Sequence, residues 1–292
     1  KRKQLNISIM KHQSISKLMK KTLFLCTILI MVLSSCETKD NGDGEEQTET
    51  DTTAQDSTCE DTSLVVGISR TELPWLDGGI TAQKALIDSV VKAGGESIRL
   101  SLSRDNLRDE VRDHILYCNE VGLHVLVMIK IGAIAEIYPP ETALRDGKDR
   151  FWDVYCHSDI DSTLYASWIH DILSYWKQAG CEIDGIEVGN EFAWCDFNGD
   201  FPIMPEGAGF TYDASYTYSS LPEKVRTGLN KVGITVRQTR QAIDENWGQE
   251  QEPVLILGGL NYFVDPSWMI SKGGTIMKPD YVLQILSGSA SD

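Results

Sequence analysis

Five short apolar runs, spaced along residues 63–260 and separated by longer segments, constrain the fold more than any other feature. The runs are SLVVGIS (63–69), SIRLSLS (97–103), HVLVMIKIG (124–132), IDGIEVGNE (183–191) and PVLILGGL (253–260). Each has the length of a β-strand with little polar alternation, which is typical of parallel strands covered on both faces. Helical segments between parallel strands form right-handed βαβ crossovers, so the pattern predicts an α/β fold.

Two of the connecting segments have helical periodicity. In residues 162–180 the apolar positions fall four apart, at Leu164, Trp168, Ile172 and Trp176, with Tyr165, Ile169 and Leu173 beside them. Residues 223–247 are predicted to form a second long helix. The first run is followed by neither GxGxxG nor GxxxxGK[ST], which a doubly wound nucleotide-binding sheet would usually carry. The prediction is therefore a (β/α)8 barrel.

Unusual polar residues lie where a barrel places its active site, at the carboxyl ends of the strands. Asn190 and Glu191 end the fourth run, and Lys130 lies near the end of the third. Glu187 lies deeper in the fourth run, where an unpaired buried charge costs several kcal/mol. We therefore expect Glu187 to pair with Arg99 or Lys130 inside the barrel.

The run ending in Asn-Glu resembles clan A of the glycoside hydrolases, the retaining (β/α)8 glycosidases. IEVGNE is similar to the E-x-G-N-E forms of several families in that clan, and Arg99 is similar to an arginine that many of them carry on strand two. The resemblance covers residues 64 to about 290 and implies that Glu191 is the general acid/base and that Asn190 binds the sugar 2-hydroxyl. Phe192 replaces the proline that often follows this Glu, which argues against family 5 in particular.

Retaining hydrolysis explains why these residue types would be needed. One carboxylic acid protonates the leaving oxygen, and a carboxylate about 5 to 5.5 Å away attacks the anomeric carbon. Consecutive strand residues face opposite sides, so the strand must bend at its end if Asn190 and Glu191 are to reach one ligand. The plain alternatives are that these two residues begin a solvated loop and that Arg99 only neutralises Glu187.

The loops after the third and fourth runs are rich in aromatic residues, which suit a carbohydrate cleft because sugar rings stack on aromatic planes. These residues are Tyr138, Phe151, Trp152, Tyr155, Phe192, Trp194, Phe197, Phe201, Phe210, Tyr212, Tyr216 and Tyr218. We expect about a third of them to line a cleft, with Trp194 and Trp75 foremost, and the rest to form small cores within the loops. Cys156 and Cys195 lie in the same loops and either form a disulfide or remain free.

The N-terminal region has a different character. Residues 1–18 are predicted to lie upstream of a start at Met19, and residues 19–36 resemble a bacterial lipoprotein signal that ends at a lipidated Cys36. The alternative is an uncleaved anchor helix, although the apolar run is short for a membrane span. Residues 36–62 form an acidic tether with little to bury, and residues 63–292 form the barrel domain. The predicted location is the cell envelope, with the protein lipid-anchored in the outer membrane and exposed at the cell surface.

Charge and cysteine usage exclude several functions. The whole chain has a net charge of −16, and without residues 1–35, which hold seven basic and no acidic residues, the charge is −23. Such a surface repels nucleic acid. The cysteines show no CxxC and the histidines are scattered, so no metal site and no other cofactor is expected. The membrane is expected as a partner only through the lipid, and the protein is expected to be a monomer.

We interpret the chain as a glycoside hydrolase that acts on a β-linked polysaccharide or oligosaccharide. Three further strands would need on the order of 100 residues beyond Asp292. In the clan that it resembles, the nucleophile ends strand seven, so the resemblance implies a barrel truncated after its fifth βα unit and inactive as given. Two alternatives are a lipoprotein that binds glycans on a degenerate barrel without cleaving them, and a purely structural surface protein.

Overall fold

The computed structural model describes residues 65–71, 73, 76–104, 108–193, 195–203, 217–248 and 252–258. The chain divides into two units, residues 1–60 and 61–292, and every described residue belongs to the second. The predicted signal segment, Cys36 and the acidic tether fall outside the described residues, as do Trp75 and Trp194.

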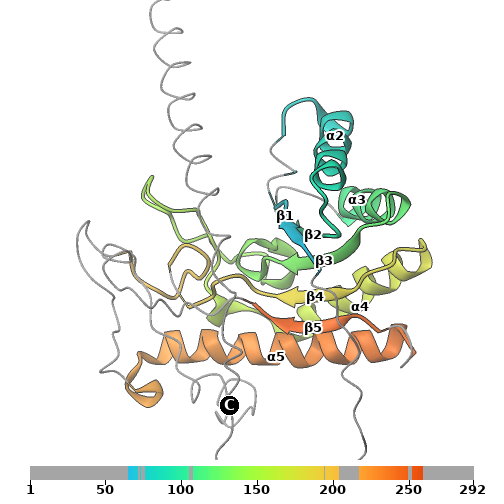
Figure 1. Cartoon of the computed structure of the whole chain (residues 1–292). Coiled ribbons are helices and arrows are strands. Elements are labelled where there is room, and N and C mark those ends of the chain that lie inside the picture. Colours follow the sequence, from blue (N-terminus) through green and yellow to red (C-terminus); the bar gives the residue numbers. More distant parts are fainter. Residues whose placement is uncertain are drawn as a thin grey trace, which may run out of the picture. The chain divides into compact units, whose positions relative to one another are not determined.

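Five strands form one parallel sheet whose order in space is their order in the chain (Figure 1). The strands are β1 (Gly67–Ser69), β2 (Ser97–Leu102), β3 (His124–Ile129), β4 (Gly185–Val188) and β5 (Val254–Leu257). The helices that join them are α2 (Gly79–Lys92), α3 (Arg108–Glu120), α4 (Ser162–Gln178) and α5 (Glu223–Asn246). Short 3-10 turns lie in the two long loops, at Ile131–Ala133, Ala135–Ile137, His157–Asp159 and Tyr218–Ser220.

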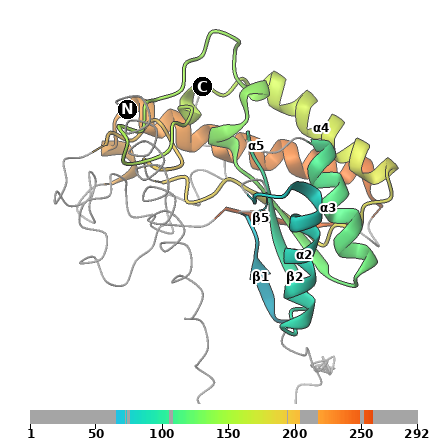
Figure 2. The ribbon, with the colours of Figure 1, turned by 90° about the horizontal axis from the view of Figure 1, so that it is seen from above.

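This strand order agrees with barrel winding. A doubly wound sheet reverses its strand order at a switch point, where its ligand binds. No reversal occurs among the five described strands, and one helix lies in each crossover. Seen from above, α2, α3, α4 and α5 follow one another around the sheet (Figure 2). The predicted α/β fold with the first five strands of a barrel is confirmed.

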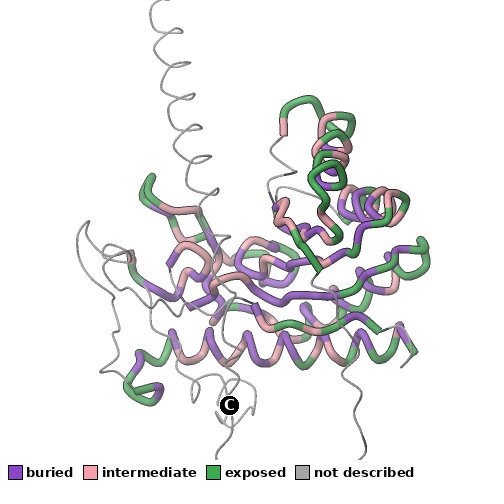
Figure 3. The backbone as a smooth tube through the Cα atoms, in the orientation of Figure 1, coloured by how far each residue is buried: buried purple, intermediate pink, exposed green. Residues whose placement is uncertain are grey.

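Residues alternate between two faces of the sheet. The outer face packs against the helices in one apolar core, to which β2 contributes Ile98, Leu100 and Leu102, β3 contributes Val125, Val127 and Ile129, and β4 contributes Ile186 and Val188. The opposite, inner face carries a row of residues in register across four strands, Ser101, Met128, Glu187 and Ile256. The buried positions concentrate between the sheet and the helices (Figure 3). The inner face is therefore where polar groups of β2 and β4 meet.

The helix predictions were accurate in extent and partly wrong in detail. Residues 223–247 were predicted and α5 spans Glu223–Asn246. In α4 the core face is formed by Tyr165, Ile169, Ile172, Leu173 and Trp176. Leu164, which the four-residue spacing assigned to that face, is 39% exposed. The Asp161 carboxylate caps α4 by accepting bonds from the backbone N–H groups of residues 163 and 164, which places Leu164 in the first turn.

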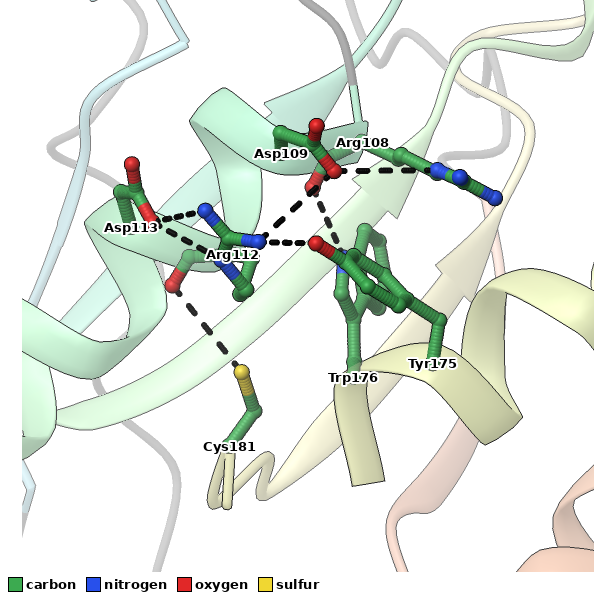
Figure 4. A network of polar contacts seen from close by, with 7 residues as sticks. All are labelled: Arg108, Asp109, Arg112, Asp113, Tyr175, Trp176 and Cys181. Atoms are coloured by element: carbon green, nitrogen blue, oxygen red, sulfur yellow. Dashed lines mark hydrogen bonds and ion pairs between the residues drawn. The ribbon is translucent and has the colours of Figure 1, made fainter. Parts of the chain in front are cut away.

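A polar seam joins α3 to α4 at the outer layer (Figure 4). The Arg112 guanidinium donates to Asp113 at 2.6 Å and to the hydroxyl of Tyr175. The indole Nε1 of Trp176 donates to the backbone oxygen of Arg108 at 3.0 Å, so this buried side chain leaves no unpaired donor. These contacts hold α3 and α4, the helices before and after β3, against each other. None of the helices in the described ranges is long and apolar enough to cross a bilayer.

Candidate functional site

The chain turns sharply at the carboxyl end of β4. The strand ends at Val188, so the prediction that it continues to Glu191 is wrong. Gly189 has φ 82° and Glu191 has φ 42°, both in the left-handed region. Two left-handed residues within three positions end the pleat, which supplies the bend that the sequence required for Asn190 and Glu191. The backbone N–H of Gly258 donates to the Val188 oxygen at 2.8 Å, which ties β5 to this turn.

Glu187 is neutralised by Arg99, as one of the two sequence alternatives predicted. Glu187 is 6% exposed, and its two carboxylate oxygens accept from Arg99 Nε at 2.7 Å and from Nη2 at 2.8 Å. This paired geometry is the strong form of an arginine–carboxylate contact, because two parallel bonds fix the relative orientation. The pair removes the cost of an isolated buried charge on the inner face.

Arg99 also reaches beyond Glu187 to the turn. The same Nη2 donates to the Asn190 side-chain oxygen at 3.0 Å. Side chains from two non-adjacent strands, β2 and β4, and from the turn after β4 are thereby joined, since β3 lies between β2 and β4. Arg99 and Asn190 were predicted as substrate-binding residues, and the structure brings them into direct contact. Their contact with a substrate stays a prediction.

Glu191 follows this cluster in the turn and is half-buried. Left-handed backbone costs a residue other than glycine about 1–2 kcal/mol, so its conformation at φ 42° is an energetic expense. Strained backbone conformations of this kind occur often at functional sites, where they orient a functional side chain. Apart from Glu191, the described non-glycine residues at positive φ are Lys148 and Asp149, which lie in an exposed loop turn.

Lys130 directly follows β3, and its backbone N–H donates to the Leu102 oxygen at 3.0 Å. Its ammonium lies 5.3 Å from the centroid of the Trp152 ring, within reach of a cation–π contact. Trp152 in turn meets Phe197 edge-on, with centroids 5.2 Å apart. These two half-buried rings come from the β3–α4 and β4–α5 loops, whereas the half-buried Phe151 and Tyr155 pack against the apolar core.

Other loop aromatics are buried, but they belong to the main apolar core together with the strands and helices and do not form separate cores within the loops. The fully or nearly fully buried ones are Tyr138, Phe192, Phe201 and Tyr218. Phe210, Tyr212 and Tyr216 lie outside the described residues, together with Trp194. Cys156 and Cys195 are both free thiols, so of the two alternatives the disulfide is not formed.

A buried carboxylate that the sequence analysis missed fastens the two long loops together. Both oxygens of Asp200 accept from Ser158, one from the hydroxyl at 2.6 Å and one from the backbone N–H at 3.0 Å. Asn198 adds a second link, because its side-chain oxygen accepts from the backbone N–H of His157 at 3.3 Å. Burial raises the pKa of Asp200 to about 6, against the opposing effect of the Ser158 bonds and Lys224.

Sequence did carry a signal for this contact. Gly228 lies inside α5, where glycine costs roughly 1 kcal/mol relative to alanine and implies a packing reason. A Cβ at that position would overlap the Asp200 carboxylate, so the glycine makes room for it. The loop that begins with Glu191 is thus anchored on the loop after β3 and on α5.

No protein-family model and no curated protein matches the chain. Similar solved structures include the GH53 catalytic domain of Ignisphaera aggregans, with 12% identity, a TM-score of 0.43 and coverage of 78% of this chain and 57% of that one. Fungal beta-1,4-galactanases align with 11% identity, a TM-score of 0.40 and coverage of 67% and 53%. A beta-glucosidase from Thermotoga maritima aligns with 10% identity, a TM-score of 0.35 and coverage of 68% and 49%. This chain therefore spans about half the length of these glycoside hydrolases.

Proposed function

We propose that the protein is a retaining glycoside hydrolase in which Glu191 is the general acid/base. The observation that carries the proposal is the strained turn after β4, where Glu191 is held at φ 42° beside an asparagine tied to the Arg99–Glu187 pair. Active-site residues of parallel α/β barrels follow the strands at this edge. A half-buried carboxylate next to an oriented amide supplies the acid and the ligand contact that glycosidic cleavage needs.

The two carboxylates of this region have different roles in the proposal. Glu187 is committed to two bonds with Arg99 and is nearly inaccessible, so it is not the attacking group. Glu191 protonates the leaving oxygen in the first step and activates water in the second. The nucleophilic carboxylate has no candidate among the described inner-face residues. We propose that it belongs to a βα unit later than the five seen here.

The proposed substrate is a β-linked polysaccharide or oligosaccharide. Support comes from the half-buried Trp152 and Phe197 rings, which come from the loops after β3 and β4 and offer apolar surfaces of the kind on which sugar rings stack. The reaction as proposed requires no metal or organic cofactor, since both steps use carboxyl groups and water.

Glu191→Gln tests the assignment in the protein expressed with any residues that follow Asp292 in its reading frame. Cleavage of β-glycans with poor leaving groups should fall about 10²- to 10⁴-fold, because the acid is lost. Aryl β-glycosides with good leaving groups should keep much of their first step, since they need no proton. Glu136→Gln, at an exposed position in the loop after β3, is the matched control and should behave as the parent protein does.

Equal activity of Glu191→Gln on both substrate classes would remove Glu191 from the mechanism. Saturable glycan binding by the parent protein without any hydrolysis would instead favour the glycan-capturing lipoprotein. Product chromatography over a polysaccharide panel would identify the sugar and linkage.

We also propose that the protein is lipid-anchored in the cell envelope through Cys36, with the acidic residues 36–62 as a spacer. The signal-like composition of residues 19–36 supports this location. Labelled palmitate should enter the expressed protein and should be absent from Cys36→Ala. Unlabelled parent protein in the soluble fraction would contradict the anchor.

A further inference from the structure

We propose that Glu187 and Arg99 are positioning residues that fix the Asn190 carboxamide with its N–H₂ group facing the ligand, so that this point of the site binds a hydrogen-bond acceptor and not a donor. The ligand named here, a sugar hydroxyl or ring oxygen, rests on the proposed function, whereas the orientation of the amide does not.

The orientation follows from the chemistry of arginine. A guanidinium group donates hydrogen bonds and accepts none, so the Asn190 atom that faces Arg99 Nη2 at 3.0 Å must be the carbonyl oxygen. The amide nitrogen then points away from Arg99. Among the described residues, no side-chain or backbone oxygen accepts a bond from Nδ2 of Asn190. Asn190 is half-buried, so this donor is available at the turn beside Glu191.

Glu187 is needed because a single hydrogen bond cannot fix the orientation of the Arg99 guanidinium. Its two oxygens grip Nε and Nη2 together at 2.7 and 2.8 Å, and this fork fixes the direction of the Nη2–H that reaches Asn190. Glu187 is itself held by the strand, because β4 pairs with β3 on one side and β5 on the other. Strand β4 therefore positions Glu187, Glu187 orients Arg99, and Arg99 orients Asn190.

Glu187→Gln would disrupt the paired contact between Glu187 and Arg99. A glutamine amide offers one acceptor and one donor, so one side of the Arg99 fork would face another N–H donor. Arg99 would then turn, and Asn190 would lose the contact that distinguishes its oxygen from its nitrogen. A ligand would meet either group, and the preference for an acceptor oxygen would weaken.

The first measurement needs no substrate. Nitrogen-15 NMR of the protein should show one pair of Asn190 side-chain amide signals, assigned by their loss in Asn190→Asp. In Glu187→Gln these signals should shift or broaden. Asp184→Asn, which removes an exposed carboxylate just before the same strand, is the matched control and should leave them in place. Unchanged Asn190 signals in a folded Glu187→Gln protein would overturn the proposal.

The second measurement is a double-mutant cycle on an aryl β-glycoside that the parent protein cleaves. Glu187→Gln and Asn190→Ala should each lower kcat/KM about tenfold or more, and the double variant should lose no more than Asn190→Ala alone. Losses that multiply would overturn the proposal, because they would give Glu187 a role independent of Asn190.

The two measurements also distinguish a failure of the proposed function from a failure of a variant to fold. If the parent protein cleaves nothing, the proposed function fails while the NMR comparison still decides the orientation of Asn190. If Glu187→Gln does not fold, Arg99→Lys replaces it, since a lysine keeps the charge but cannot make the paired contact. Asn190 signals that stay unchanged in folded Arg99→Lys would overturn the proposal as well.

Discussion

Asp200→Asn should change how the stability of the protein depends on pH. The carboxyl group of Asp200 is 8% exposed, and burial raises its pKa from 3.8 to about 6. At pH values between 3.8 and about 6, the Asp200 carboxyl group is therefore protonated in the folded state and ionised in the unfolded state. The stabilisation due to this proton is complete below pH 3.8 and is lost as the pH rises through about 6.

The difference between the two pKa values corresponds to about 3 kcal/mol. Part of this stabilisation is already lost at pH 4, so between pH 4 and pH 7 the free energy of unfolding of the parent protein should fall by about 2 kcal/mol more than that of Asp200→Asn. The other ionisable groups that interact with Asp200, which are Lys224, Asp159, Cys156 and Tyr138, remain in both proteins, so the comparison changes one carboxyl group. Urea denaturation at both pH values, followed by tryptophan fluorescence, gives the four free energies.

Ser158→Ala should act in the opposite direction. The Ser158 hydroxyl donates to Asp200 at 2.6 Å and lowers its pKa, so removing this hydroxyl should extend the loss of stability to higher pH. The reasoning would be refuted if the parent protein and Asp200→Asn lost the same free energy between pH 4 and pH 7, or if the parent lost less.

Two substitutions test the packing around the site. In Gly258→Ala the new Cβ would overlap the Gly189 oxygen, so we expect a loss of about 1–3 kcal/mol in urea denaturation and displaced Asn190 amide signals in NMR; a neutral effect would contradict the close approach of β5 to the turn. Tyr165→Phe removes a buried bond to the Thr239 hydroxyl at 2.8 Å and should cost about 0.5–1.5 kcal/mol, whereas Leu173→Ala on the same helix should cost about 2–5 kcal/mol. An equal loss for both would contradict the assigned core face of α4.

The alternation of strands and helices was predictable because it depends on local composition. Each of the five apolar runs contains the strand that forms there, and the predicted helix over 223–247 differs from α5 by one residue. The strands are shorter than their runs, because pairing stops where a neighbouring strand does. Residue 257 of β5, for example, is in register with Val188, and both strands end there.

Leu164 shows the limit of periodicity. Spacing alone defines two adjacent stripes on α4, one through Leu164 and Trp168 and one through Tyr165 and Ile169. Only the position of α5 decides between them, and it selects Tyr165, which bonds to Thr239 of that helix. Asp200 was missed for a related reason. The sequence around Asp200 is typical of a polar turn. The carboxylate is buried because it packs against Gly228 of α5, which is distant in the sequence.

The site was predictable up to the last residue of β4 and not beyond it. Alternation along a strand placed Glu187 on the inner face, and the cost of burying its charge required a cation there, which is Arg99. The same alternation would place Glu191 on the face of Glu187, but alternation holds only while the chain is pleated. With Gly189 at φ 82° and Glu191 at φ 42°, the alternation ends at Val188. The direction of Glu191 is therefore determined by the turn, whereas the pairing of Glu187 with Arg99 is determined by the position of Glu187 within the paired strand.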